Sequence, residues 1–69
     1  MKPKIKYPNI AAEMVRSGYN QKTLADKLGL AAPSLHYRLY GEIEWKTKEC
    51  LILCKLFNKD FTYLFEEGK

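Results

Sequence analysis

The chain has 69 residues, of which 46% are hydrophobic, and its 12 basic and 8 acidic side chains give a formal net charge of +4. A chain of this size buries only ~60% of the surface that its unfolded form exposes, which leaves no room for a two-lobed catalytic cleft. The apolar content excludes intrinsic disorder, and two cysteines are too few to staple a secreted miniprotein. We therefore expect one compact domain that forms the entire protein and is not an enzyme.

No segment has the pattern of a targeting or membrane sequence. The basic residues 1–6 are not followed by the apolar run of about 7 or more residues that a signal peptide requires. The longest apolar run covers residues 50–54, whereas a membrane-spanning helix needs about 20 residues. A cytoplasmic protein without a membrane partner is expected.

The excess positive charge lies at the amino-terminal end. Residues 1–22 contain five basic side chains and one acidic side chain, whereas residues 23–69 contain seven of each. Lys2, Lys4 and Lys6 belong to residues 1–8, which we expect to form a basic arm. Such an arm attracts a polyanion such as DNA through phosphate neutralisation, or it is a solvated tail that aids solubility.

Apolar periodicity predicts an all-α chain that begins with a short helix over residues 9–17. Asn9 is its expected cap, and Gly18 follows it as a stop. Only residues 2–7 alternate as a strand does, and a proline interrupts this weak pattern.

The next two helices are predicted to be joined by a tight turn. The second covers about residues 21–28, with Asn20 as its cap and Gly29 as a left-handed exit. The third covers about residues 33–40, because Pro33 fixes φ at a first helical position and disfavours helical geometry in the residue before it. These features are typical of a helix-turn-helix unit, although they also describe any tightly turned helical hairpin.

A fourth helix is predicted over residues 47–57 with Thr47 as its cap, and a last turn over residues 61–66 with Asp60 as its cap. The fourth helix is apolar on more than one side, so a compact bundle of about five short helices has to cover it twice. Either the last helix folds back over the second stripe, or a second copy of the chain covers it. The candidate contacts of a homodimer are Leu51, Ile52, Leu56, Leu64 and Phe65.

Three segments carry a resemblance to a known family. They are residues 20–30 (NQKTLADKLGL), the later Ser34, Leu35 and Gly41, and Phe57 followed by DFTYLF at residues 60–65. Together they resemble the lambda-repressor-like (Cro/XRE) helix-turn-helix family, and LHYRLYG at residues 35–41 is similar to its phage and prophage subset. The resemblance covers about residues 9–66 and leaves residues 67–69 as a tail.

This resemblance implies a DNA-binding transcriptional regulator whose third helix lies in the major groove. The start of the second helix then faces the phosphate backbone, which makes Asn20 and Gln21, with Lys22 beside them, phosphate contacts. The implied groove-side residues are Ala32, Pro33, Ser34, His36, Tyr37 and Tyr40. Helical spacing supports most of this set, because residues 33, 36, 37 and 40 form one stripe and Leu35 and Leu39 point away from it. Arg38 lies on a flank, where it either reaches a phosphate or extends into water.

The sequence departs from the family where bases are commonly read. Gln, Asn or Arg usually stands near the start of the recognition helix, whereas this chain has Ala32 and Pro33 there, and neither side chain forms hydrogen bonds. Specificity then depends on Tyr37 and His36, on DNA shape, or on little at all. The alternative function is a protein-interaction module on the same scaffold, since outward tyrosines also suit protein interfaces.

The cysteines and the residues before the fourth helix are expected to have structural roles, and no catalytic motif is found. Cys50 and Cys54 lie one turn apart, but a single histidine leaves no ligand set for zinc, so we expect small buried hydrophobes, no metal and no cofactor. Ile43 and Trp45 are expected to fix the entry of the fourth helix to the core. No glycine-rich phosphate loop and no nucleophile matched to His36 is present, which argues against catalysis.

Overall fold

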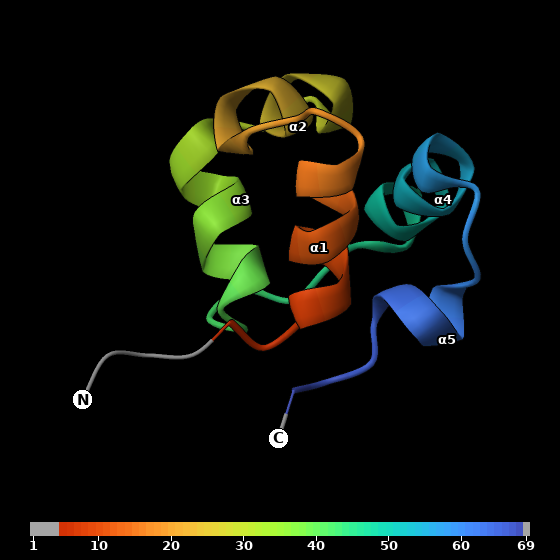
Figure 1. Cartoon of the computed structure of the whole chain (residues 1–69). Helices are drawn as coiled ribbons and strands as arrows, with labels where there is room; N and C mark the ends of the chain where they lie inside the picture. The colour runs from red at the N-terminus through yellow and green to blue at the C-terminus, as the bar shows by residue number, and fades with distance from the viewer. Residues whose placement is uncertain (1–4, 69) are drawn as a thin grey trace.

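The structure is a computed structural model that describes residues 5–68 (Figure 1). Within these residues it contains five helices and no strand. The helices are α1 (Pro8–Arg16), α2 (Gln21–Leu28), α3 (Ala32–Leu39), α4 (Thr47–Phe57) and α5 (Phe61–Leu64). The all-α prediction is therefore confirmed, whereas the predictions for Lys2 and Lys4 lie outside the described residues.

Every helix contributes to a single apolar core. The first four helices each provide two buried side chains one turn apart, as residues i and i+4 do on one helix face. The core consists of Ile10, Met14, Leu24, Ala25, Leu28, Leu35, Leu39, Leu53, Phe57 and Leu64. Because five elements share this one core, the chain is compact, with a Cα radius of gyration of 11.0 Å.

The ends of α2 match the prediction. The Thr23 N–H donates to Asn20 Oδ1 at 2.9 Å, and the Asn20 N–H donates to Thr23 Oγ1 at 2.8 Å. This reciprocal pair is a capping box, which satisfies backbone donors that have no partner inside the helix. At the other end, Gly29 has φ +72°, a left-handed conformation that only glycine adopts without strain.

The predicted starts of the other helices need correction. Asn9 is not a cap: α1 begins at Pro8, and the Asn9 amide donates instead to the Tyr63 carbonyl oxygen of α5 at 2.8 Å. Thr47 is the first residue of α4, and the cap position before it is taken by Lys46. The Lys46 N–H donates to the Glu49 carboxylate at 3.1 Å.

Two smaller corrections concern α3 and α5. α3 begins one residue early, so Pro33 occupies its second position and Ala31 takes the extended conformation that precedes a helix. Asp60 stands at the cap position of α5, but its side chain makes no cap hydrogen bond, and α5 ends at Leu64.

In Figure 1, α1 and α3 run side by side, and α2 crosses above one end of both. α2 packs against α3 more extensively than any other pair of helices does, and α5 contacts both α1 and α4. None of the helices within residues 5–68 has the length and apolar character needed to cross a lipid bilayer.

Candidate nucleic-acid interface

The turn between α2 and α3 is held by the backbone. The Leu30 N–H donates to the Ala25 carbonyl oxygen at 2.8 Å, which closes the turn behind the left-handed Gly29. Ala25 is 1% exposed, so a larger side chain at this position would overpack the core that α2 and α3 share. The backbone turn and the packing of α2 against α3 thus hold the two helices together.

One face of α3 is open to solvent. Pro33, His36 and Tyr37 are exposed and Tyr40 is partly buried, whereas Leu35 on the opposite face is fully buried. The His36 ring lies 4.4 Å from the Tyr40 ring and 5.7 Å from the Tyr37 ring, centroid to centroid. The predicted stripe is therefore brought together as one surface of three adjacent rings, which we call the aromatic stripe of α3 (His36, Tyr37 and Tyr40).

The start of α2 carries the predicted phosphate contacts. Lys22 is exposed and Gln21 is partly buried, and both belong to the first helical turn. Helix starts favour anions because their N–H groups point outward and the helix dipole is positive there. Asn20 has a structural role, since its side-chain oxygen is already the acceptor of the Thr23 N–H.

Arg38 is not available to DNA, and both alternatives proposed for it from the sequence are wrong. Its side chain is buried, and Nε donates to Glu49 Oε1 at 2.8 Å while Nη1 donates to the Ser34 carbonyl oxygen at 3.2 Å. Because Glu49 also accepts from the Lys46 N–H, one carboxylate connects α3 to the start of α4.

The predicted groove-side residues at the start of α3 differ in exposure. Ala32 and Ser34 are partly buried, and Pro33 is exposed. The Ser34 carbonyl oxygen is occupied by Arg38. Ala32 and Pro33 therefore offer shape and apolar contact, as a thymine methyl requires, and the Ser34 hydroxyl is the hydrogen-bonding side-chain group at the start of α3.

Lys6 connects the amino-terminal arm to the end of α3. Its N–H donates to the Leu39 carbonyl oxygen at 2.9 Å, and its stem lies directly over Gly41. Its ammonium group is 3.9 Å from the Glu67 carboxylate. The Lys6 ammonium therefore has an exposed acidic partner within the protein.

The residues predicted to form a dimer interface differ in how exposed their side chains are. Leu51 is 59% exposed, whereas Ile52, Leu56 and Phe65 are partly buried against the core. Leu64 is fully buried, so it was wrongly assigned to an interface: α5 turns it toward the core. Sequence reasoning missed Phe61, which is 56% exposed. Its place directly after Asp60 predicted the start of a helix but not whether the Phe61 side chain faces the core or the solvent.

Trp45 fixes the approach to α4 as predicted, because its ring meets Phe65 edge to face at 5.5 Å. Ile43 does not share this role, since it is 40% exposed.

Cys50 and Cys54 are free thiols and only partly buried. Burial, followed by the nearby Cys54 and Glu49, raises the pKa of the Cys50 thiol above its ordinary 9.0. Within residues 5–68, no three His, Cys, Asp or Glu side chains gather as a metal site requires.

Comparison of the chain with protein-family models, with curated proteins and with solved structures gives no match. We therefore infer the function from the chemistry of the surfaces described above.

Proposed function

We propose that the protein is a small DNA-binding transcriptional regulator of the lambda-repressor-like (Cro/XRE) type, similar to those of phages and prophages. In this proposal α3 enters the major groove of double-stranded operator DNA, and the start of α2 faces the phosphates. The protein would act by occupying the operator.

The observation that carries the proposal is the open face of α3, a helix that packs closely against α2. Pro33, His36 and Tyr37 are exposed beside one another, while the side chains on the opposite face hold α3 in the core. Imidazole and phenol groups donate hydrogen bonds to phosphates and to base acceptors. Gln21 and Lys22 stand at the positive end of α2, where phosphate binds favourably.

The binding of short duplexes to purified protein tests this proposal. Fluorescence anisotropy with a random-sequence duplex at low salt should give measurable binding, which weakens about 5- to 10-fold in Tyr37→Ala and in Gln21→Ala if each loses one hydrogen bond. Val15→Ala is the matched control, because Val15 is 72% exposed and belongs to α1. Equal losses in all three variants would contradict the assigned surface.

A second candidate function, a protein-interaction module, is favoured by one observation. The start of α3 offers only Ala32 and Pro33 where a base reader needs a hydrogen-bonding side chain. The aromatic stripe of α3 would then bind a partner protein, such as another repressor, and duplex DNA would not bind even at low salt.

We also propose that the protein forms a homodimer through the exposed side of α4. Leu51 and Phe61, both more than half exposed, border one apolar pocket together with Cys54. A two-fold dimer would place two α3 helices on half-sites about one DNA turn apart. Sedimentation equilibrium should show a dimer that Leu51→Lys dissociates, and a monomeric wild type at high concentration would contradict it.

A further inference from the structure

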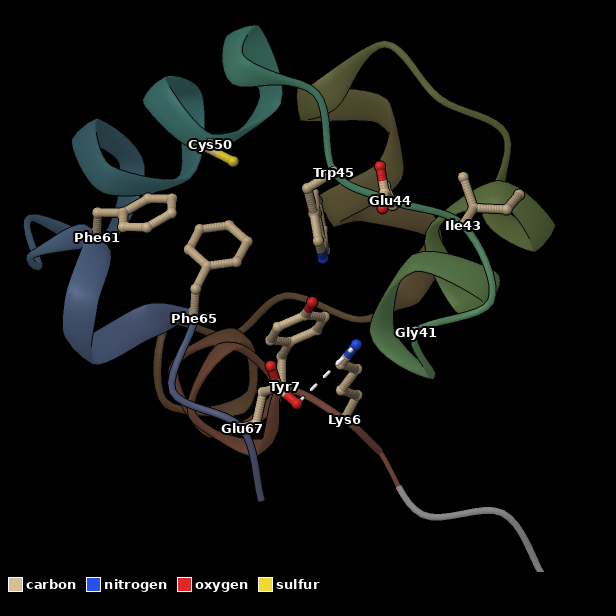
Figure 2. A pocket seen from close by; sticks show the side chains of 10 residues that line it. All are labelled: Lys6, Tyr7, Gly41, Ile43, Glu44, Trp45, Cys50, Phe61, Phe65 and Glu67. Atoms are coloured by element: carbon tan, nitrogen blue, oxygen red, sulfur yellow. Dashed lines mark ion pairs between the residues drawn. The ribbon is translucent and has the colours of Figure 1, made fainter. Parts of the chain in front are cut away.

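A pocket of about 350 Å³ lies where the amino-terminal arm, the α3–α4 loop, α4 and α5 meet. Four of the nine aromatic side chains of the protein line it: Tyr7, Trp45, Phe61 and Phe65. Figure 2 shows the rings of Tyr7, Trp45 and Phe65 around a common space. We call these four side chains the aromatic cage.

The rings of the aromatic cage meet at steep angles. The Phe65 ring is inclined by 69° to the Tyr7 ring at 5.6 Å and by 82° to the Trp45 ring at 5.5 Å. Phe61 stacks on Phe65 at 4.7 Å. In each inclined pair the edge of one ring meets the face of the other, so Tyr7, Trp45 and Phe65 lie in different planes around the pocket.

The charged groups at the pocket are mainly acidic. Glu44 and Glu67 line it together with one cation, Lys6. The Lys6 ammonium lies 5.7 Å from the centroid of the Tyr7 ring and 3.9 Å from the Glu67 carboxylate, the ion pair drawn in Figure 2. The arm thus already places one ammonium group against an aromatic face and a carboxylate.

We propose that the aromatic cage binds a small organic cation of the quaternary ammonium class and releases the Lys6 ammonium in doing so. A cation within about 6 Å of an aromatic face is attracted by the ring quadrupole, and quaternary ammonium groups are the ligands that aromatic cages recognise. The two carboxylates favour a positive ligand and disfavour a phosphate or other anion. This inference goes beyond the proposed DNA binding and does not depend on it.

Two observations indicate that the pocket accepts such a ligand. The side chain of Lys6 is 41% exposed and that of Glu67 is 64% exposed, so their ion pair is screened by water and displaced at low cost. The Trp45 Nε1–H is the buried side-chain donor that has no acceptor among residues 5–68. A hydroxyl group on the ligand, as in choline, supplies an acceptor for it after a small shift of the indole.

Fluorescence titration tests the proposal directly, because Trp45 is the sole tryptophan of the chain. The probes are choline and its neutral isostere 3,3-dimethyl-1-butanol, which has carbon in place of the charged nitrogen, with sodium chloride as the ionic-strength control. We expect choline to bind about tenfold more tightly than the isostere. Equal affinities would reduce the site to an apolar pocket, and an unchanged signal with both probes would mean that nothing binds; either result overturns the proposal.

Substitutions then separate the parts of the site. Lys6→Met keeps the stem over Gly41 but removes the competing ammonium, so choline should bind several-fold more tightly. Glu67→Gln should weaken choline binding several-fold, whereas Asp26→Asn, which removes an exposed carboxylate from α2, should leave it unchanged. Circular dichroism confirms the fold of each variant. An unchanged affinity in Lys6→Met, or equal effects of the two carboxylate substitutions, would contradict displacement of Lys6 and the role of Glu67.

Discussion

Asn20 stabilises the start of α2, the helix whose first turn would face phosphate. Its side chain and backbone take part in two reciprocal hydrogen bonds with Thr23. Asp60 occupies the equivalent position before α5 without any cap hydrogen bond. The two residues therefore allow a comparison between a cap that is formed and a cap position that is unused.

We expect Asn20→Ala to lower the free energy of unfolding by about 1 kcal/mol, the usual contribution of a side-chain cap. Asp60→Ala should cost less, because no cap hydrogen bond is lost. Urea denaturation of both variants measures the difference. Equal losses would show that the capping box adds nothing to the stability of α2.

Tyr63 reports on the attachment of α5 to α1. Its hydroxyl donates to Glu13 Oε2 at 2.9 Å, and Arg16 also donates to this oxygen at 2.7 Å. The hydrogen bond to Glu13, followed by desolvation, raises the pKa of Tyr63 above its ordinary 10.0. The folded protein therefore holds this proton more tightly than the unfolded chain does.

The sign of the pH dependence follows from this raised pKa. The stabilisation is complete below pH ~10, where both states are protonated, and it is lost as the pH rises from there through the pKa of the folded state. We expect Tyr63→Phe to flatten the fall in stability above pH ~10, measured by urea denaturation across the alkaline range. Tyr37→Phe, which removes an exposed hydroxyl, is the control. Identical slopes for the wild type and Tyr63→Phe would contradict the assignment.

At the level of whole helices, the Arg38–Glu49 pair connects α3 to α4. Both side chains are 8% exposed, and their separation is 2.8 Å. A buried ion pair contributes little compared with apolar side chains of the same volume, but removal of one partner leaves a buried charge uncompensated. The pair therefore fixes the position of α3 more than it stabilises the fold.

Arg38→Met should destabilise the protein by about 3 to 5 kcal/mol, and the double variant Arg38→Met/Glu49→Leu should recover most of this loss. Thermal and urea denaturation of the two single variants and the double variant form the cycle. Additive losses would mean that the two residues do not act as a pair.

The helices were predictable from the sequence because glycine, proline and the capping Asn20 mark their ends and paired apolar residues mark their buried faces. Partners from distant parts of the chain were not. Asn9 looks like a cap until Tyr63 is brought to it, and Arg38 looks like a surface cation until Glu49 is placed beside it. Leu64 was assigned to an interface because spacing shows that a helix has an apolar side but does not show what covers that side. The aromatic stripe of α3 was predictable because its members are close in the sequence, two within α3 and Tyr40 at its C-cap.

At the scale of the whole molecule, the net charge of +4 comes from residues 1–22. The aromatic stripe of α3 has no lysine or arginine of its own, since Arg38 is neutralised in the core. Electrostatic attraction of DNA would then come from the arm and from α2, while α3 would contribute shape and hydrogen bonds.

Replacement of both Lys2 and Lys4 by Gln should reduce the salt dependence of DNA binding by up to about two phosphate contacts while leaving the helical content unchanged. Binding isotherms at several salt concentrations, with circular dichroism of the same samples, measure both quantities. An unchanged salt dependence would make the arm a solubilising tail only.

The proposed function requires that this domain binds double-stranded DNA. The most direct measurement is a titration of the wild-type protein against a random duplex between about 50 and 200 mM salt, the range over which phosphate contacts are readily counted. We expect clear binding at the lower salt concentration and a linear fall of log K with log salt, at about 0.9 per phosphate contact. Absence of binding at the lowest salt concentration would contradict it and favour a protein partner for the aromatic stripe of α3.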